Sequence, residues 1–201
     1  MPTLNKDIRI FEQESKIKHY ERANQKKQKP KVIWFTGISG SGKSTLANAL
    51  DEMLTICGKH CYILDGDNMR SGLCSDLDFS DISRDENIRR VAETARLMFN
   101  AGLIVIVATI SPFKRHRDFA RSLFPSDDFY EVYINASFEE CAKRDTKGLY
   151  KNAKSGIVKN FTGKTSNYEI PVNPDLNIKT DSLSVIDSIE EIINFFKKKL
   201  I

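Results

Sequence analysis

The chain has 201 residues, of which 40% are hydrophobic and 29% charged, with a formal net charge of +4. These values favour one globular α/β domain with a sizeable core, and the mild positive charge, concentrated in KKQKPK at 26–31, fits anionic small substrates better than nucleic acid. Every apolar run is shorter than the ~20 residues that span a bilayer, the N-terminus lacks a signal-peptide core and the cysteine spacings match no zinc site, so we expect a cytoplasmic protein.

The first part of the chain divides into a leader and the start of an alternating pattern. Residues 1–30 are charged and weakly periodic, which predicts an N-terminal leader with one helix at 5–24, ahead of a single domain at 31–201. The apolar run VIWFT at 32–36 is typical of a strand buried on both faces. Helical spacing of apolar residues follows at 43–57, closed by Gly58, and a second strand is expected at 61–66.

The alternation of strand and helix continues to the C-terminus. Ser83 and Glu86 resemble a capping box ahead of a helix that ends near Gly102, and Ser111-Pro112 resembles an N-cap followed by a helical proline. The unbroken apolar run LIVIVATI at 103–110 predicts a strand at the sheet centre. Two further strands are expected at 129–136 and 176–180, and two further helices after Ser137 and at 184–199. This pattern predicts a doubly wound, five-stranded parallel sheet with helices on both faces.

One long segment interrupts the alternation. Residues 146–175 are polar and rich in glycine and proline. Segments of this length inside a compact domain are usually lids or binding loops, or else disordered. We expect a lid here.

The segment TGISGSGKST at 36–45 has the spacing G-x-x-x-x-G-K-S after a strand and at the start of a helix, which is the context of a P-loop. The backbone N–H groups and the helix dipole favour phosphate, Lys43 can reach the β- and γ-phosphates, and Ser44 can offer its hydroxyl to Mg²⁺. An ordinary strand–turn–helix junction is the alternative. The predicted ATP-binding residues are Gly37, Ile38, Ser39, Gly40, Ser41, Gly42, Lys43, Ser44 and Thr45.

Two acids follow the second strand, in LDGDNMR at 64–70. The strand at 103–110 ends without a carboxylate, so the acidic group of the site is expected at Asp65 or Asp67, whose strand opens on the same crevice. Asp65 fits a turn or cap equally well; Asp67, with Arg70 close behind, favours a role at the attacking hydroxyl or at magnesium. The guanine-reading NKxD of GTPases is absent, and the chain's small size favours a small-molecule kinase.

Three features describe the acceptor of such a kinase. Arg70, Arg84 and Asn87 surround a helix start, where arginine forks can bind oxyanions; surface charge is the alternative. Phe79 and Phe161 are aromatic residues in polar segments, which can stack on a nucleobase or, equally, fill small hollows in their loops. A basic lid, with Arg144 and Lys147 at its hinge, can close over the transferring phosphate, or be a solvated loop. These features together indicate a nucleotide acceptor.

At this point the sequence resembles the adenylylsulfate kinase (APS kinase) family over roughly residues 31–200. The matching stretches are long and occur in the family's order: VIWFTGISGSGKSTLANAL, LDGDNMR, GLCSDLDFS, SRDENIRRVAE, LMFNAGLIVIVATISPF, CAKRDTKGLYKNA, NFTG and YEIPVNP. The resemblance implies transfer of the γ-phosphoryl of ATP, with Mg²⁺, to the 3′-hydroxyl of adenosine 5′-phosphosulfate in sulfate assimilation. It also implies a homodimer.

The resemblance further implies roles for individual residues. Arg70, Arg84 and Asn87 would grip the acceptor's phosphosulfate and ribose, and Phe79 and Phe161 would clamp its adenine. The other implied roles are Asp67 near the attacking hydroxyl and magnesium, Lys147 near the transferring phosphate, Arg144 packed on ATP, and Ile110, Ser111, Gly148 and Leu149 against the acceptor.

Ser111 occupies the position at which the family is described as forming a phosphoserine intermediate. In-line transfer requires only positioning and charge neutralisation, and an N-cap would also account for this serine.

The chain departs from the family pattern at a few positions. Ser71 stands where histidine is usual, Thr146 where proline or valine is common, and Lys164 and Thr165 where an apolar residue and aspartate are usual. The last pair lies in the expected lid and leaves a kinase for a related nucleotide as the alternative. A non-catalytic nucleotide-binding partner of a sulfurylase is a second alternative, against which the intact Lys43, Asp67 and Lys147 argue.

Overall fold

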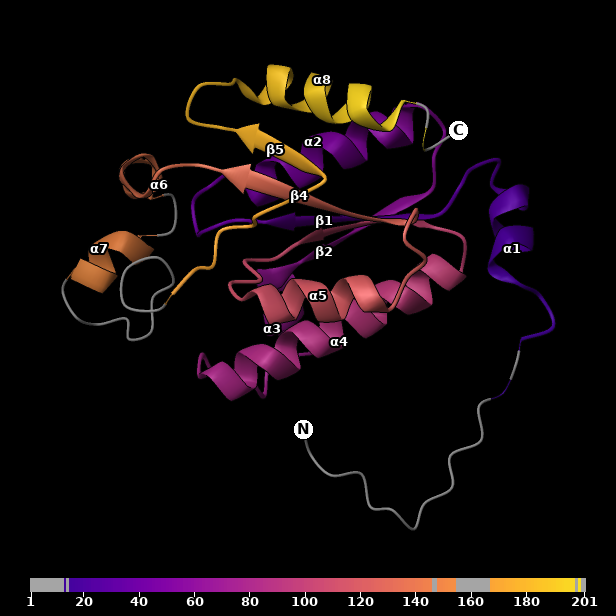
Figure 1. Cartoon of the computed structure of the whole chain (residues 1–201), viewed down its shortest axis with the longest axis horizontal. Helices are drawn as coiled ribbons and strands as arrows, with labels where there is room; N and C mark the ends of the chain where they lie inside the picture. The colour runs from indigo at the N-terminus through magenta and orange to yellow at the C-terminus, as the bar shows by residue number, and fades with distance from the viewer. Residues whose placement is uncertain (1–12, 14, 146–147, 155–166, 198, 200–201) are drawn as a thin grey trace, which may run out of the picture.

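The computed structural model of the chain describes residues 13, 15–145, 148–154, 167–197 and 199 (Figure 1). The elements occur in the order α1 His19–Gln25, β1 Lys31–Thr36, α2 Lys43–Ile56, β2 Cys61–Asp65, α3 Gly66–Ser71, α4 Asp81–Asn100, β3 Ile104–Ala108, α5 Lys114–Ser122, β4 Phe129–Asn135, α6 Phe138–Arg144, α7 Leu149–Lys154, β5 Leu176–Lys179 and α8 Val185–Phe196.

The five strands form one parallel sheet in the order β2-β3-β1-β4-β5. The middle strand is therefore β1, and β3, expected at the centre, lies one position away from it. All residues of β1 and β3 are buried, whereas the edge strands β2 and β5 each bury one residue. A continuous apolar run thus marks a strand covered on both faces, and a broken run marks an edge.

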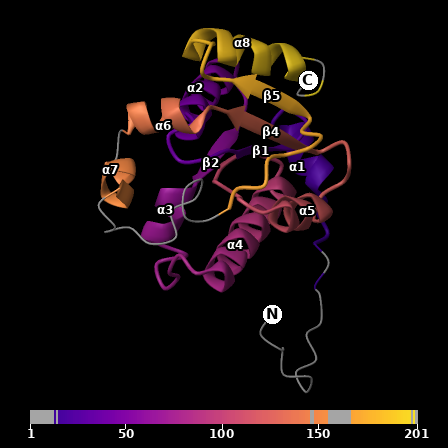
Figure 2. The same ribbon diagram turned by 60° about the vertical axis from the view of Figure 1, so that its left-hand side comes forward.

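Helices cover both faces of the sheet, as the alternation predicted (Figure 2). On one face, α2 and α8 pack against the sheet through residues such as Leu50 and Ile192. On the other face, α4 and α5 pack through residues such as Val91 and Ala120, around the fully buried Trp34. The predicted three-layer, doubly wound fold is confirmed.

Three helix starts differ from the sequence predictions. The N-cap of α4 is Ser80, whose Oγ accepts from the Ser83 amide, so the predicted capping box at Ser83 and Glu86 is wrong. The N-cap of α5 is Phe113, so the predicted N-cap role of Ser111 is wrong as well. A distant carboxylate takes over that function, because Glu169 Oε2 accepts from the Lys114 amide. The short helix α3 was not expected; Asp65 caps it.

The described part of the leader packs against the sheet's amino end. The sequence predicted a helix over residues 5–24, and the structure has α1 at His19–Gln25. Residues 5–12 and 14 of the predicted helix lie outside the described residues. Ala23 is buried, and Gln28 Nε2 donates to the carbonyl groups of His60 and Gly102. In Figure 1, α1 lies at the opposite end of the sheet from α6 and α7. The cavity described below is at that other end.

Helix length and polarity were also compared with what a membrane crossing requires. Within the described ranges, no helix is both long and apolar enough for it.

Candidate active site

A cavity of about 870 Å³ opens at the carboxyl ends of the parallel strands. The P-loop, the β2–α3 junction, the start of α4, the β3–α5 loop, α6 and the β5–α8 loop all contribute to its wall. This is the edge at which ligands bind in open parallel sheets. The predicted site residues among its lining are Ser39, Gly40, Gly42, Lys43, Ser44, Thr45, Asp67, Arg70, Phe79, Arg84, Asn87, Ile110, Ser111 and Arg144.

The P-loop has the tight backbone that its glycines predict. A Cβ atom on Gly37 would lie 2.4 Å from the Ile134 carbonyl oxygen, and Gly42 has a φ of +100° at the N-cap of α2. The Lys43 ammonium donates to the carbonyl oxygens of Gly37 and Ile38, both at 2.8 Å. The charged group is therefore held inside the loop that is shaped for phosphate.

Asp65 connects the P-loop to the end of β2. Its Oδ2 accepts a hydrogen bond from Ser44 Oγ at 2.6 Å, and its Oδ1 accepts from the Asp67 amide at 2.9 Å. The reading of Asp65 as a helix cap is therefore confirmed, and its place beside Ser44 leaves a role at magnesium as a prediction. Asp67 also lines the cavity. A hydroxyl and a carboxylate side by side are the hard oxygen donors that Mg²⁺ prefers.

Two arginines stand at the far end of the cavity from the β5–α8 loop. Arg84 is buried and donates from Nε to the Phe79 carbonyl at 3.0 Å. Arg70 donates to the carbonyl groups of Leu77 and Asp78, and its guanidinium lies 4.4 Å from the Phe79 ring centroid. Burial lowers the pKa of both guanidinium groups, which remain cationic at neutral pH. Phe79 itself is 59% exposed, as expected of a ring available for stacking.

Asn87 lies one turn after Arg84 on α4. It is buried and lines the cavity, yet its Oδ1 atom has no hydrogen-bond partner among the residues that the structure describes. Buried polar atoms are almost always paired, so this oxygen indicates a place for a ligand donor.

Ser111 takes part in a buried network. Its side-chain oxygen accepts from Trp34 Nε1 at 2.9 Å and shares a hydrogen bond of 2.7 Å with Thr109 Oγ1. Its φ is +45°, and the residue is only 1% exposed. The hydroxyl therefore has a structural function.

The opposite end of the cavity involves residues that the sequence analysis partly missed. Arg144 donates to the Thr180 carbonyl at 2.6 Å and pairs with Glu140 at 3.2 Å. Thr180 Oγ1 donates to Ser41 O, and Tyr150 OH donates to Ser39 O at 2.6 Å, so both fix the P-loop backbone. The position of Thr180 directly after a strand could have identified it. Nothing in the sequence pattern marks Tyr150.

Several predicted residues cannot be placed in this cavity. Lys147 and Phe161, together with Thr146, Lys164 and Thr165, lie outside the described residues. Gly148 precedes α7 with a φ of +66°, and Leu149 begins that helix.

Comparison with known proteins agrees with this geometry. The profile of the family described as adenylylsulphate kinase matches residues 29–179. An adenylyl-sulfate kinase of Vibrio parahaemolyticus is 50% identical over 194 residues, which cover 96% of this chain and 95% of that protein.

The fold is also similar to solved structures of APS kinases. The APS kinase CysC of Mycobacterium tuberculosis, solved in complex with AMPPNP and APS, has a TM-score of 0.81 and 41% identity, covering 85% of this chain and 99% of that chain. A hexameric APS kinase from Thiobacillus denitrificans has a TM-score of 0.65 and 28% identity, covering 86% of this chain and 29% of that chain. Since the family model covers most of the chain and a relative of 50% identity covers nearly all of it, the chain belongs to the adenylylsulphate kinase family.

Proposed function

We propose that the chain is an ATP-dependent adenylyl-sulfate kinase. It transfers the γ-phosphoryl group of ATP to the 3′-hydroxyl of adenosine 5′-phosphosulfate, and the product is 3′-phosphoadenylyl sulfate, which belongs to sulfate assimilation. The observation that supports this most is the continuous cavity, which has the P-loop and the pair Arg84 and Asn87 in one wall. Donor and acceptor can therefore lie end to end in it, as in-line transfer requires.

The P-loop side binds the donor. Backbone N–H groups of residues 37–45 and the Lys43 ammonium neutralise the phosphates, and Arg144 packs on the ATP molecule. Ser44 and Asp65 would hold Mg²⁺, and Asp67 would complete its oxygen environment. Bound there, Mg²⁺ would neutralise charge on the β- and γ-phosphates.

The α3–α4 side binds the acceptor. Arg70 and Arg84 offer planar guanidinium groups to the phosphosulfate, and Asn87 Oδ1 can accept from a ribose hydroxyl. Phe79 stacks on the base, with Phe161 proposed on the base's second face. Asp67 accepts the proton of the attacking hydroxyl, and Lys147 is proposed at the transferring phosphate. Ile110, Ser111, Gly148 and Leu149 are proposed to contact the acceptor.

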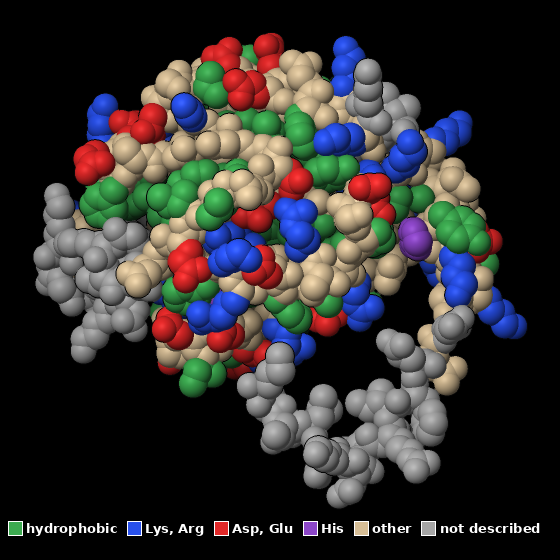
Figure 3. All heavy atoms as spheres, viewed as in Figure 1, with side chains coloured by type: hydrophobic (Ala, Val, Ile, Leu, Met, Phe, Trp, Pro, Cys, Tyr) green, Lys and Arg blue, Asp and Glu red, His purple; other side chains and the backbone are tan. Residues whose placement is uncertain are grey.

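Assembly and location are also part of the proposal. We propose a homodimer in the cytoplasm, with residues 1–30 as a leader and the remainder as the kinase domain with a lid at 146–175. The relative from Thiobacillus denitrificans is hexameric, so the subunit number is to be measured by light scattering of the purified chain. On the face shown in Figure 3, basic and acidic side chains are interspersed. Such a surface does not favour nucleic acid.

An acceptor screen tests this function. The purified chain is given ATP and Mg²⁺ with adenosine 5′-phosphosulfate, AMP or CDP, and the phosphorylated product is identified by mass spectrometry. We expect turnover only with adenosine 5′-phosphosulfate, and we expect Asp67→Asn to abolish turnover while ATP binding is retained. Turnover on AMP or CDP alone would assign a related nucleotide as acceptor, and inactivity with every acceptor would exclude a kinase.

A further inference from the structure

The β3–α5 loop forms one wall of the acceptor end, and its backbone is strained. Ile110, Ser111 and Pro112 line the cavity. Ser111 has a φ of +45°, in the left-handed region that residues with a side chain rarely adopt. Such a conformation costs free energy and persists only where surrounding contacts hold it. The contacts of this loop therefore determine the shape of the wall.

The carbonyl groups of Ile110, Ser111 and Pro112 in this loop accept hydrogen bonds from three parts of the fold. Thr36 Oγ1, at the end of β1, donates to Ile110 O at 2.7 Å. Arg117 Nη1, from α5, donates to Ser111 O at 2.9 Å. The Glu169 amide donates to Pro112 O at 2.8 Å. Three separate segments thus fix three consecutive residues.

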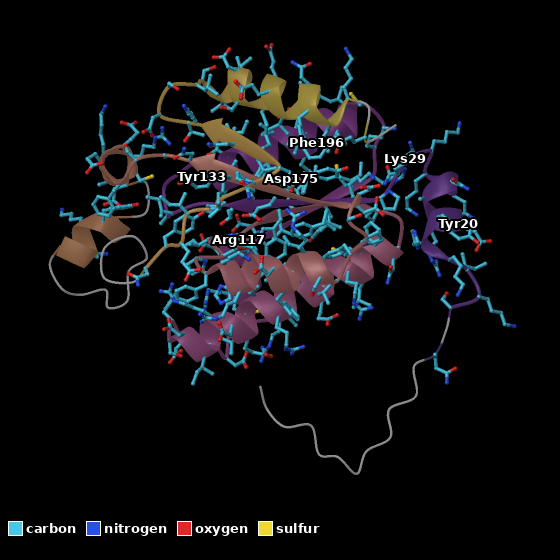
Figure 4. The ribbon with its side chains drawn as sticks, viewed as in Figure 1. Tyr20, Lys29, Arg117, Tyr133, Asp175 and Phe196 are labelled. Atoms are coloured by element: carbon cyan, nitrogen blue, oxygen red, sulfur yellow. The ribbon has the colours of Figure 1, made fainter. Side chains whose placement is uncertain are left out.

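Arg117, which is labelled in Figure 4, contacts the loop, the segment that carries Glu169, and β4. Its side chain is 3% exposed, and its Nε atom pairs with Glu131 Oε1 of β4 at 2.9 Å. Its Nη2 atom donates to Glu169 O at 2.8 Å, beside the bond from Nη1 to Ser111. One planar guanidinium group therefore fixes the strained loop, β4 and the segment that carries Glu169 in one geometry.

The carboxylate of Glu131 requires a positive charge at position 117. Burial raises the pKa of the Glu131 carboxyl, and the guanidinium groups of Arg117 and Arg121 act in the opposite direction. Removing the guanidinium of Arg117 would leave a largely buried carboxylate, which is strongly destabilising. A test therefore has to keep the positive charge and change only the geometry of the donors.

We propose that Arg117 is a positioning residue for the acceptor. It holds the β3–α5 loop against β4 and Glu169, so that this wall of the cavity keeps the shape that binds adenosine 5′-phosphosulfate. Its described contacts reach the acceptor wall and do not include P-loop residues, so its effect falls on the acceptor and not on ATP. The identity of the acceptor rests on the proposed function; the positioning of the loop does not.

The test compares Arg117→Lys with Arg121→Lys. Lysine keeps the charge but cannot donate in three fixed directions. We expect Arg117→Lys to raise KM for adenosine 5′-phosphosulfate about tenfold, with KM for ATP changed less than about twofold. Arg121 is the matched control, because it lies one turn along α5 and contacts Glu131 and Asp175, but it does not line the cavity. Arg121→Lys should change neither KM.

Hydrogen exchange supplies a readout that needs no acceptor. In Arg117→Lys, peptides containing residues 109–113 and 167–171 should exchange faster than in the wild type, while P-loop peptides should not. Arg121→Lys should leave the exchange rates of the peptides at 109–113 and 167–171 unchanged.

The outcomes are distinct. An unchanged acceptor KM in Arg117→Lys, or an equal rise in the KM for acceptor and ATP, overturns the positioning role. If the wild type does not phosphorylate adenosine 5′-phosphosulfate, the proposed function fails. Hydrogen exchange then decides alone: faster exchange confined to the two peptides supports the positioning role, and unchanged exchange overturns it.

Discussion

The two ends of the cavity are built in different ways. At the donor end, the residues proposed to bind phosphate are consecutive, at 37–45, from the end of β1 to the first turn of α2. At the acceptor end, the residues come from α3, α4 and the β3–α5 loop, and the Glu169 amide holds that loop from a distant part of the chain. The donor end is thus built on one consecutive segment, whose backbone Tyr150 and Thr180 fix from distant positions, whereas the acceptor end is assembled from several elements.

This difference separates the expected effects of mutations. Changes at the donor end should lower kcat, since charge develops on the phosphates during transfer. Changes at the acceptor end should raise the acceptor KM, because they alter binding and leave the phosphate site intact. Variants that break this separation would show that the two ends do not act independently.

The largest effect is expected from Asp65→Asn at the donor end. Asparagine keeps an oxygen that can accept from the Asp67 amide, so the cap of α3 is retained, but the negative charge beside Ser44 is lost. We expect kcat to fall about 10³-fold, with a higher Mg²⁺ concentration needed for half-maximal rate. The measurement is the initial rate as a function of Mg²⁺ concentration.

Asp76→Asn is the control for this change. Asp76 loses the same charge, but it pairs with Arg90 on the surface and does not line the cavity. Its kcat should stay within about twofold of the wild type, since surface ion pairs contribute little. A kcat for Asp65→Asn close to that of the wild type would remove Asp65 from the metal site and leave it as a cap only.

A smaller effect is expected from Asn87→Leu at the acceptor end. The variant should be more stable than the wild type but should bind the acceptor more weakly. The substitution removes a buried oxygen that has no partner, so the free energy of unfolding should rise by about 1 kcal/mol. The acceptor KM should rise by about tenfold or more, because that oxygen is proposed to bind the ribose. Urea unfolding and acceptor titrations measure the two quantities.

Asn100→Leu, at the exposed end of the same helix, is the matched control and should alter neither quantity. If Asn87→Leu lowers stability and leaves the acceptor KM unchanged, Asn87 is a structural residue and the acceptor lies elsewhere.

The comparison of the two ends also explains how far the sequence could predict the site. The P-loop, the two fully buried strands β1 and β3, and the fold follow from local patterns such as VIWFTGISGSGKS. Arg70, Arg84 and Asn87, which are proposed to bind the acceptor, were identifiable as lining residues because they lie between the second strand and the start of α4 or in its first turns. Arg117 and Tyr150 were missed, since each donates to a backbone carbonyl on a distant segment, Glu169 O and Ser39 O, and spacing in the sequence does not report such contacts.

Helix caps show the same limit. Ser83 followed by Glu86 fits a capping box, but Ser80 is the N-cap and begins α4 earlier. For α5 the capping carboxylate comes from Glu169, 55 residues from Lys114, and no local pattern contains that information.

The smallest effect on activity is expected from Ser111→Ala, which tests whether a covalent phosphoserine takes part. The hydroxyl is engaged by Trp34 Nε1 and Thr109 inside the fold, so its loss leaves a buried indole N–H without its partner. We expect the free energy of unfolding to fall by about 1–3 kcal/mol and kcat to stay within about threefold. Ser122→Ala, exposed on α5, should change neither. A covalent route predicts instead a collapse of kcat and, in the wild type with ATP alone, a phosphoserine at 111 detectable by mass spectrometry. The network favours direct transfer, because the hydroxyl would have to give up its buried hydrogen bonds with Trp34 and Thr109 in order to attack ATP.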